Sequence, residues 1–308
     1  MEMLIQVVLL AVGFALLVKG ADWFVEGASD IAAKLKIPQL IIGLTIVAMG
    51  TSAPEAAVSI SAALKGSADI TIGNIVGSNI LNILIILGLS SLIAPLAVER
   101  NTTRREMPFL VVTSLLLLAQ GWDGTISLLD GVVMIAFFAV YLGYLLVKAR
   151  RQPEQQPETA GQRSLWKILL LTAVGLTAII LGSSVAVDAA CAIARLMGMS
   201  ERFIGLTIVA LGTSLPELFT SVTAARRGNV GIAVGNIVGS NIFNILFVVG
   251  LSALVVPVPF AAVFRFDGIV AAASAVLLLV FCAGAGKLKR WHGAVMLAGY
   301  AAYFLMIL

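Results

Sequence analysis

Two stretches of the sequence repeat each other: GLTIVAMGTSAPE at residues 43–55 and GLTIVALGTSLPE at residues 205–217. Each is followed by a second shared stretch, GNIVGSNILNIL at 73–84 and GNIVGSNIFNIL at 235–246. At an offset of 162 residues the alignment runs without a gap over 53 positions, of which 32 are identical. A repeat of this length predicts a chain built from two similar halves.

The composition predicts an all-α integral membrane protein, with the lipid bilayer as its main partner. Hydrophobic residues make up 60% of the 308 residues and charged residues 12%, whereas a soluble domain has about 45–50% and about 25%. The mean hydropathy is +1.06. Ten apolar stretches are close to the ~20 residues that a membrane-spanning helix needs. They are residues 3–18, 39–64, 70–98, 107–121, 126–147, 165–187, 203–225, 230–261, 267–286 and 291–308.

Ten helices divide into five per half, and this odd number has a consequence for the topology. The second copy must enter the membrane in the opposite direction from the first, as in inverted-repeat transporters. We therefore expect a five-helix repeat over 1–147, a linker over 148–164, and a second, inverted five-helix repeat over 165–308, together forming one membrane domain. The linker is rich in Gln, Pro and Glu and has no apolar periodicity, which predicts a solvated connector.

The basic residues predict the orientation in the membrane. When the loops are assigned alternately to the two sides, sixteen of the twenty Lys and Arg residues fall on one side, and only Lys65, Arg195, Arg202 and Arg265 fall on the other. The positive-inside rule then places both termini outside and the 148–164 linker in the cytoplasm, in a plasma (inner) membrane. The net charge of +4 is explained by this bias, and no nucleic-acid partner is expected.

Two glutamates, Glu55 and Glu217, lie in the middle of apolar segments of the two repeats. A carboxylate there costs about 2.5–3.5 kcal/mol on insertion scales. The apolar cores 39–63, 70–98, 203–225 and 230–261 contain no basic residue, so cations from outside are the expected partners. Protonated carboxyls hydrogen-bonded to Ser or Asn are the structural alternative.

The residues next to these glutamates are suited to a hard cation. Pro54 and Pro216 have no N–H, so we expect backbone carbonyls near Ala48–Gly50 and Ala210–Gly212 to lose their helical partners and become ligands. Hydroxyls in the same turns come from Thr51, Ser52, Thr213 and Ser214. Calcium binds about 6–8 oxygen atoms of these kinds. The only histidine, His292, lies far from the motifs, which disfavours a transition-metal site.

The second shared stretch carries more oxygen donors. Ser78 and Asn82 are four residues apart, as are Ser240 and Asn244, so each pair shares one helical face. We expect these hydroxyls and amides to pair with the glutamates across the helix interface and complete an oxygen cage. For Asn74 and Asn236, nearer the helix ends, we prefer simple adhesion between helices.

The sequence offers no support for an enzyme. There is no HExxH motif, no Cys/His cluster and no triad partner for a serine, and no cofactor is expected. A channel would conduct without a counter-ion, whereas two buried carboxylates favour a carrier that moves only when they are neutralised.

At this point the paired G-T-S-x-P-E and G-N-x-x-G-S-N-x-x-N motifs resemble the repeats of the calcium/cation antiporter superfamily, specifically a prokaryotic sodium/calcium exchanger. The resemblance implies a central calcium site formed by Glu55, Glu217 and the carbonyls of Thr51 and Thr213. It also implies flanking sodium sites that involve Ala48, Ser52, Ser78, Ala210, Ser214 and Ser240. Some members carry an aspartate where this chain has Asn82 and Asn244, so the resemblance leaves ion stoichiometry and potassium dependence open.

The sequence therefore predicts a secondary antiporter that exchanges Ca²⁺ for Na⁺ by alternating access. An antiporter coupled to H⁺ or dependent on K⁺ is the alternative. The oligomeric state cannot be read from the sequence.

Overall fold

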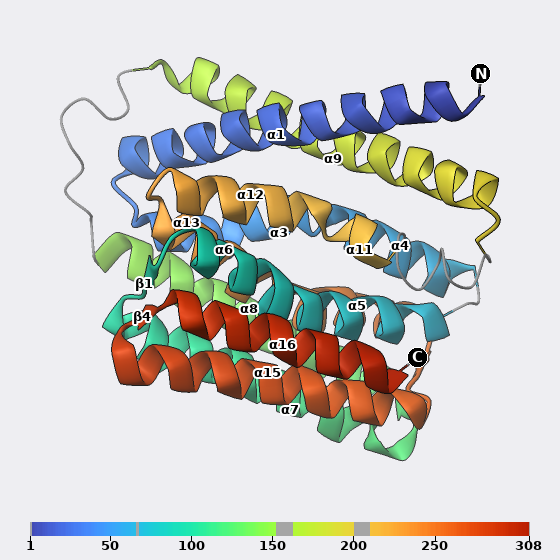
Figure 1. The fold of residues 1–308 in the computed structure, drawn as a ribbon. Helices are drawn as coiled ribbons and strands as arrows, with labels where there is room; N and C mark the ends of the chain where they lie inside the picture. The colour runs from blue at the N-terminus through green and yellow to red at the C-terminus, as the bar shows by residue number, and fades with distance from the viewer. Residues whose placement is uncertain (1, 66–67, 152–162, 200–209, 308) are drawn as a thin grey trace.

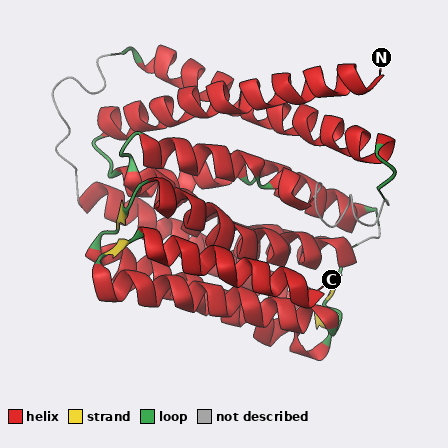
Figure 2. Ribbon diagram, viewed as in Figure 1, coloured by secondary structure: helices red, strands yellow, loops and turns green. Residues whose placement is uncertain are grey.

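The computed structural model describes residues 2–65, 68–151, 163–199 and 210–307, and it is built almost entirely of helices (Figures 1 and 2). The first half comprises α1 (Glu2–Leu35), α2 (Gln39–Ile42), η1 (Gly43–Val47), α3 (Ala48–Thr51), α4 (Ala53–Leu64), α5 (Asp69–Leu81), η2 (Asn82–Leu87), α6 (Gly88–Ile93), β1 (Leu96–Ala97), η3 (Thr102–Glu106), α7 (Met107–Gln120), η4 (Gly121–Asp123), β2 (Thr125–Ile126) and α8 (Leu128–Arg151). The second half comprises α9 (Leu165–Leu196), α11 (Ala210–Thr213), α12 (Leu215–Arg226), α13 (Val230–Phe243), η6 (Asn244–Val249), α14 (Gly250–Val255), β3 (Val258–Pro259), α15 (Val263–Ala285), β4 (Lys287–Leu288) and α16 (Arg290–Ile307).

Six helices in these ranges are long and apolar enough to cross a membrane, and the bent pair Gln39–Thr51 and Ala53–Leu64 is a seventh candidate span. The chain is therefore a multi-pass membrane protein. The expected span at 203–225 begins outside the described residues, and those at 107–121 and 291–308 coincide with the shorter helices α7 and α16. Ten spans thus stay a prediction.

Helices α1 and α9 are much longer than the sequence predicted. They have 34 and 32 residues, and they lie antiparallel against each other (Figure 1). At ~1.5 Å per residue each is roughly 50 Å long, which exceeds the ~30 Å hydrocarbon layer. Asp22, Glu26 and Asp30 extend α1 as an amphipathic helix beyond the apolar stretch 3–18, so the apolar stretch alone gives too early an end for this helix.

Glycines let the backbones of α1 and α9 touch. A Cβ atom added to Gly175 would lie 2.5 Å from the backbone nitrogen of Phe24, and one added to Gly182 would lie 2.9 Å from that of Leu17. Gly20 and Gly182 occupy matching positions of the repeat. Small residues of this kind permit close helix association in membranes, where lipid is as apolar as the helix surface.

The chain also contains four short strands, which the all-α prediction missed. Strand β1 pairs antiparallel with β4, and β2 pairs with β3. Pro95 and Pro257 account for the end of the preceding helices, because a residue before proline is pushed into extended backbone. Ala94 has φ −141° and ψ 131°, and Val256 has φ −155° and ψ 144°. The expected helical stretches 70–98 and 230–261 were therefore too long.

Each strand pair joins the two halves of the chain. Strand β3 lies 162 residues after β1, and β4 lies 162 residues after β2, the offset of the sequence repeat. The β1–β4 pair therefore becomes the β3–β2 pair when the halves are exchanged. Contacts that exchange in this way are what a two-fold relation between similar halves produces.

The centre of the bundle is formed by α5 with η2 and α6, and by α13 with η6 and α14. In these two spans 78% and 83% of the most apolar window is buried inside the protein, against 17% in α1. Helix α13 packs against α2, η1 and α3 of the first half, and α4 packs against α5. The second shared motif of each repeat thus lies in the core, next to the first shared motif.

The expected linker at 148–164 begins too early. Helix α8 continues to Arg151, residues 152–162 lie outside the described residues, and α9 starts after Ser164. Lys148 is buried, with its Nζ atom 2.7 Å from Oε1 of Glu106, and the Tyr144 hydroxyl donates to the same oxygen at 2.9 Å. Lys148 therefore belongs to a buried ion pair and not to a solvated connector.

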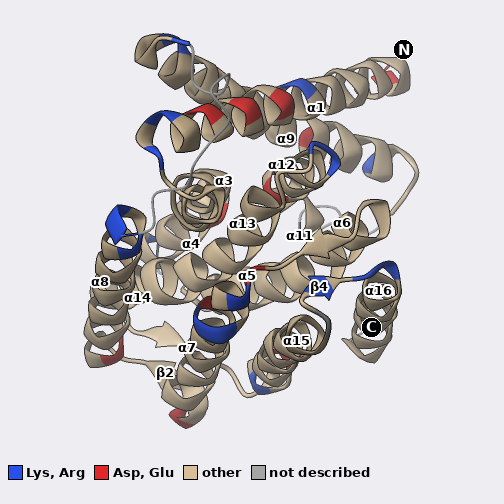
Figure 3. Cartoon of the chain, turned by 90° about the vertical axis from the view of Figure 1, so that its left-hand side faces the viewer, with Lys and Arg blue, Asp and Glu red and all other residues tan. Residues whose placement is uncertain are grey.

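Basic residues gather at one end of the bundle. Figure 3 looks onto this end, where the ends of α8 and α12 and strand β4 carry Lys and Arg. The end of α8 and the start of α9, which flank the linker, lie here, and both termini lie at the opposite end (Figure 1). Arg202, one of the four basic residues assigned to the other side, lies outside the described residues.

The α1–α9 contact yields a prediction for stability. Replacing Gly175→Leu should destabilise the protein by about 1–3 kcal/mol, because the new side chain meets backbone that cannot move aside. The measurement is the thermal unfolding midpoint in detergent, which should fall. Gly143→Leu on α8 is the matched control, since a Cβ atom there meets nothing within 4 Å. Equal midpoints for the two variants would contradict the packing account.

The buried ion pair yields a second prediction. Lys148→Met should cost about 3–5 kcal/mol, because it leaves the Glu106 carboxylate buried without its counter-charge. The double variant Glu106→Gln with Lys148→Met should recover most of this loss, since no charge is then stranded. Unfolding midpoints of the three proteins in detergent test this, and a Lys148→Met single variant as stable as the parent would show that the pair does not stabilise the fold.

Candidate cation site

The first shared motif of each half folds as two helices with a break between them. The pair Gln39–Thr51 and Ala53–Leu64 is bent by 49° at Ser52, whose φ is −81° and ψ is 6°. Ser214 occupies the same place between α11 and α12, with φ −90° and ψ 5°. Pro54 and Pro216 follow in the first turn of the new helix, where the missing N–H costs nothing.

The breaks place each glutamate in the first turn of a helix. Glu55 lies in the first turn of α4 and Glu217 in the first turn of α12. Negative charge is favoured there, because the free backbone N–H groups give the helix N-terminus a partial positive charge. Both side chains are completely buried.

The backbone carbonyls around the breaks are only partly as predicted. The Ala48 carbonyl is not freed, because it accepts the N–H of Ser52 at 3.0 Å, and the Ser240 hydroxyl also donates to it at 3.4 Å. The proline four residues ahead removes the helical donor only for Gly50 and Gly212. The Gly212 carbonyl instead accepts the hydroxyl of Ser183 on α9 at 2.8 Å. Sequence reasoning missed Ser183, because the first half has alanine at the matching position.

Crossed hydrogen bonds connect the two breaks. The hydroxyl of Ser52 donates to Oε1 of Glu217 at 2.8 Å, and that of Ser214 donates to Oε1 of Glu55 at 3.3 Å. Each serine therefore donates a hydrogen bond to the glutamate of the other half. The arrangement brings the two carboxylates into one neighbourhood, where they repel each other electrostatically.

Each glutamate is left with one buried oxygen, Oε2, that has no hydrogen-bond partner within the described residues. None of the ion pairs found in those residues includes Glu55 or Glu217. A buried polar atom without a partner costs about 1–3 kcal/mol, and more when it is charged. The two Oε2 atoms are therefore buried acceptors that no group of the described residues satisfies.

Several predicted ligands surround the glutamates. Thr51 and Ser240 lie next to Glu217, and Thr213 lies next to Glu55. Thr51, Ser52, Ser214, Ser78 and Ser240 are buried, and Thr213 is half-buried. Ala48 is buried in α3, and Ala210 is the first described residue of α11.

The asparagines of the second motif are arranged differently from the prediction. The amides of Asn82 and Asn244 do not pair with the glutamates: Asn82 Nδ2 donates to Asn241 Oδ1 at 2.9 Å, and Asn244 Nδ2 donates to Asn79 Oδ1 at 3.1 Å. Their own Oδ1 atoms are buried and have no hydrogen-bond partner in the described part of the chain. Both residues begin a π-helical turn, a local widening that is frequent at functional sites.

Asn74 and Asn236 connect helices, as expected. Asn74 Nδ2 donates to Ser59 Oγ, and Asn236 Nδ2 donates to Ser221 Oγ, each at 2.9 Å. Asn236 has a further part, since its Oδ1 accepts the Thr51 hydroxyl at 3.0 Å and so fixes a residue of the break.

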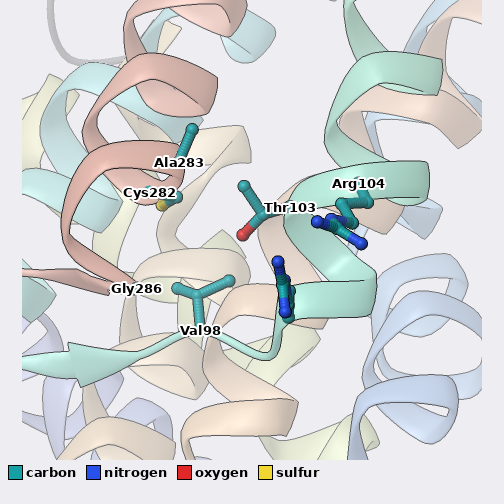
Figure 4. A pocket seen from close by; sticks show the side chains of 7 residues that line it. Val98, Thr103, Arg104, Cys282, Ala283 and Gly286 are labelled. Carbon is teal, nitrogen blue, oxygen red and sulfur yellow. The ribbon is translucent and has the colours of Figure 1, made fainter.

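A pocket of about 420 Å³ lies elsewhere, at the basic end of the bundle beside β1 and β4. In Figure 4, Cys282 and Ala283 of α15 face Thr103 of η3 across this pocket. Arg104 and Arg100 also line it. It contains none of the predicted ligands and is separate from the glutamate site.

The sequence and the fold both match known proteins. The family described as "Sodium/calcium exchanger protein" matches residues 5–147 and 167–308. The chain belongs to the sodium/calcium exchanger family. This family lies within the calcium/cation antiporter superfamily that the motifs resemble, and its members are transporters and not enzymes.

Relatives of this exchanger-family chain cover its whole length. It is 39% identical over 312 residues to the putative antiporter CaxA of Alkalimonas amylolytica, and 31% identical to the sodium/calcium exchanger MaX1 of Methanosarcina acetivorans, with 98% of each chain covered in both cases. A more distant relative, the Ca²⁺/H⁺ antiporter ChaA of Bacillus subtilis, is 27% identical, with 84% of this chain and 81% of that protein covered.

Among solved structures, the sodium-calcium exchanger NCX_Mj, soaked with 10 mM Na⁺ and no Ca²⁺, superimposes with a TM-score of 0.88. The two chains are 33% identical, and the match covers 98% of this chain and 99% of NCX_Mj. The fold is thus that of a membrane exchanger, and cation antiport is the activity that the family and its relatives share.

Proposed function

We propose that this protein exchanges Ca²⁺ for Na⁺ across the plasma (inner) membrane by alternating access. The observation that carries the proposal is the set of four buried oxygens without a partner among the described residues, one on each of Glu55, Glu217, Asn82 and Asn244. Oxygen atoms of carboxylates and amides are ligands that Ca²⁺ prefers, and Na⁺ is a hard cation that accepts the same donors.

The two carboxylates would hold the calcium ion, and neighbouring groups would complete the coordination of calcium and of sodium. The proposed ligand set is Glu55, Glu217, Asn82 and Asn244, the hydroxyl or carbonyl groups of Thr51, Thr213, Ser52, Ser214, Ser78 and Ser240, and the carbonyl of Ala210. The crossed bonds from Ser52 and Ser214 support this set, because they join the carboxylates of the two halves in one site.

Charge explains why such a site exchanges ions and does not leak them. Two ionised carboxylates inside a bundle of low dielectric constant repel each other, and moving them past the barrier without a cation is costly. One Ca²⁺ neutralises the pair, and monovalent cations do the same. The protein can then change the side to which the site is open only when it is loaded, which couples the flow of one ion to the counterflow of the other.

We propose ten membrane spans in two inverted five-helix halves, 1–147 and 165–308, joined by the connector between them. The reciprocal pairing of β1 with β4 and of β2 with β3 supports an exchangeable, two-fold arrangement. Both termini would lie outside and the connector in the cytoplasm, since the end of α8 and the start of α9, which flank the connector in the sequence, lie at the basic end of the bundle. Swapping the conformations of inverted halves converts an outward opening into an inward one.

A test of the site is sodium-driven uptake of ⁴⁵Ca²⁺ into proteoliposomes. Glu55→Gln and Glu217→Gln should each abolish it, because a neutral amide cannot balance the charge of the calcium ion. Glu99→Gln, at an exposed position between β1 and η3, is the matched control and should keep full uptake. Full uptake by both site variants would refute the proposed site.

The second ion is tested separately. Replacing internal Na⁺ by choline at constant pH should stop ⁴⁵Ca²⁺ uptake by the parent protein. Uptake that continues without sodium and follows an imposed pH gradient would instead favour coupling to H⁺, an alternative that the similarity to ChaA supports. A requirement for added K⁺ beside Na⁺ would identify a potassium-dependent exchanger.

A further inference from the structure

Four asparagines form a hydrogen-bonded network between the two halves at the centre of the bundle. Asn79 and Asn241 bond to each other in a closed ring, and Asn82 and Asn244 each donate one hydrogen bond to it. Asn79 Nδ2 donates to the backbone carbonyl of Asn241 at 3.2 Å, and Asn241 Nδ2 donates to that of Asn79 at 3.1 Å. The side-chain oxygens of these two residues accept the Nδ2 groups of Asn244 and Asn82. All four side chains are at most 3% exposed.

The network determines the orientation of all four side-chain amides. A backbone carbonyl can only accept a hydrogen bond, so the side chain of Asn79 must turn its NH₂ group to the Asn241 carbonyl and its oxygen to Asn244. Asn244 must then offer its own NH₂ group to that oxygen. The same reasoning fixes Asn82 through Asn241. The orientations follow from the network itself and do not depend on which atom of an amide is taken as oxygen.

The consequence is that the oxygens of Asn244 and Asn82 point away from the ring. These Oδ1 atoms are buried and have no hydrogen-bond partner among the described residues. Asn82 begins η2, which packs against α12 with Glu217, and Asn244 begins η6, which packs against α4 with Glu55. A flipped amide would place an NH₂ group, which repels cations, where the oxygen now stands.

We propose that Asn79 and Asn241 are positioning residues that hold the amide oxygens of Asn244 and Asn82, respectively, toward the transported cation. Each fixes the side-chain orientation of an asparagine in the opposite half. This role rests on the proposed function, because it takes Asn82 and Asn244 as ligands of the cation. Groups that orient a metal ligand in this way typically contribute 10–100-fold to metal affinity.

The first measurement is the dissociation constant for ⁴⁵Ca²⁺ in equilibrium binding to the purified full-length protein. Asn79→Leu removes the acceptor that orients Asn244, and Asn241→Leu removes the one that orients Asn82. Each should raise the constant by about 10–100-fold. In transport, the KM for Ca²⁺ should rise more than the maximal rate falls. Unchanged affinity in both variants would overturn the proposal.

A double-variant comparison separates orientation from general damage to the fold. An aspartate at a ligand position presents an oxygen whichever way it turns, so it needs no neighbouring residue to orient it. Asn79→Leu should therefore weaken calcium binding far less in an Asn244→Asp background than in the parent. In an Asn82→Asp background, Asn79→Leu should weaken calcium binding as much as it does in the parent. Asn241→Leu should show the opposite pattern. Equal losses in all backgrounds would show that the asparagines only support the fold.

Two further measurements keep the outcomes distinct. If Asn79→Leu is not monodisperse in detergent, the smaller Asn79→Ala carries the same prediction. Glu55→Gln is measured in parallel. If it binds calcium like the parent, both the proposed site and the positioning role of Asn79 and Asn241 are refuted. If Glu55→Gln loses calcium binding while the Asn79 and Asn241 variants keep parental affinity, the result supports the proposed site and refutes only the positioning role of these two asparagines.

Discussion

The structure depends on one electrostatic constraint: two carboxylates are buried in the centre of an apolar bundle, and no basic side chain of the described residues pairs with them. Elsewhere the chain solves the same problem internally, since Lys148 neutralises the buried Glu106. At Glu55 and Glu217 the described residues instead provide neutral hydroxyl groups, among them those of Ser214 and Ser52. In the proposed function, a transported cation supplies the missing positive charge.

The repeat explains how a single chain builds such a site. The break at Ser52 and the break at Ser214 each start a new helix with a glutamate in its first turn, and each serine bonds to the glutamate of the other half. The asparagine ring and the two strand pairs show the same reciprocity. The site therefore lies where the halves meet, and neither half contains a complete set of donors.

Much of this arrangement could be predicted from the sequence, because buried charge, proline and an internal repeat leave strong signals. The glutamates, the breaks beside Pro54 and Pro216, and the helical character of the chain follow from them. The length of α1 did not, because its second half is amphipathic. Neither did the partners of Lys148 and of the asparagines, since these depend on which helices meet across the halves, and a single sequence does not contain that information.

The central claim, that one cation is held between Glu55 and Glu217, is tested most directly by anomalous diffraction from crystals soaked with Sr²⁺ in place of Ca²⁺. The account predicts a single strong peak near the centre of the bundle, bonded to one carboxylate oxygen of each glutamate at a distance slightly longer than the about 2.3–2.6 Å of calcium, and its loss in Glu55→Gln crystals. A strontium ion bound elsewhere, or bound to only one of the two glutamates, would contradict it.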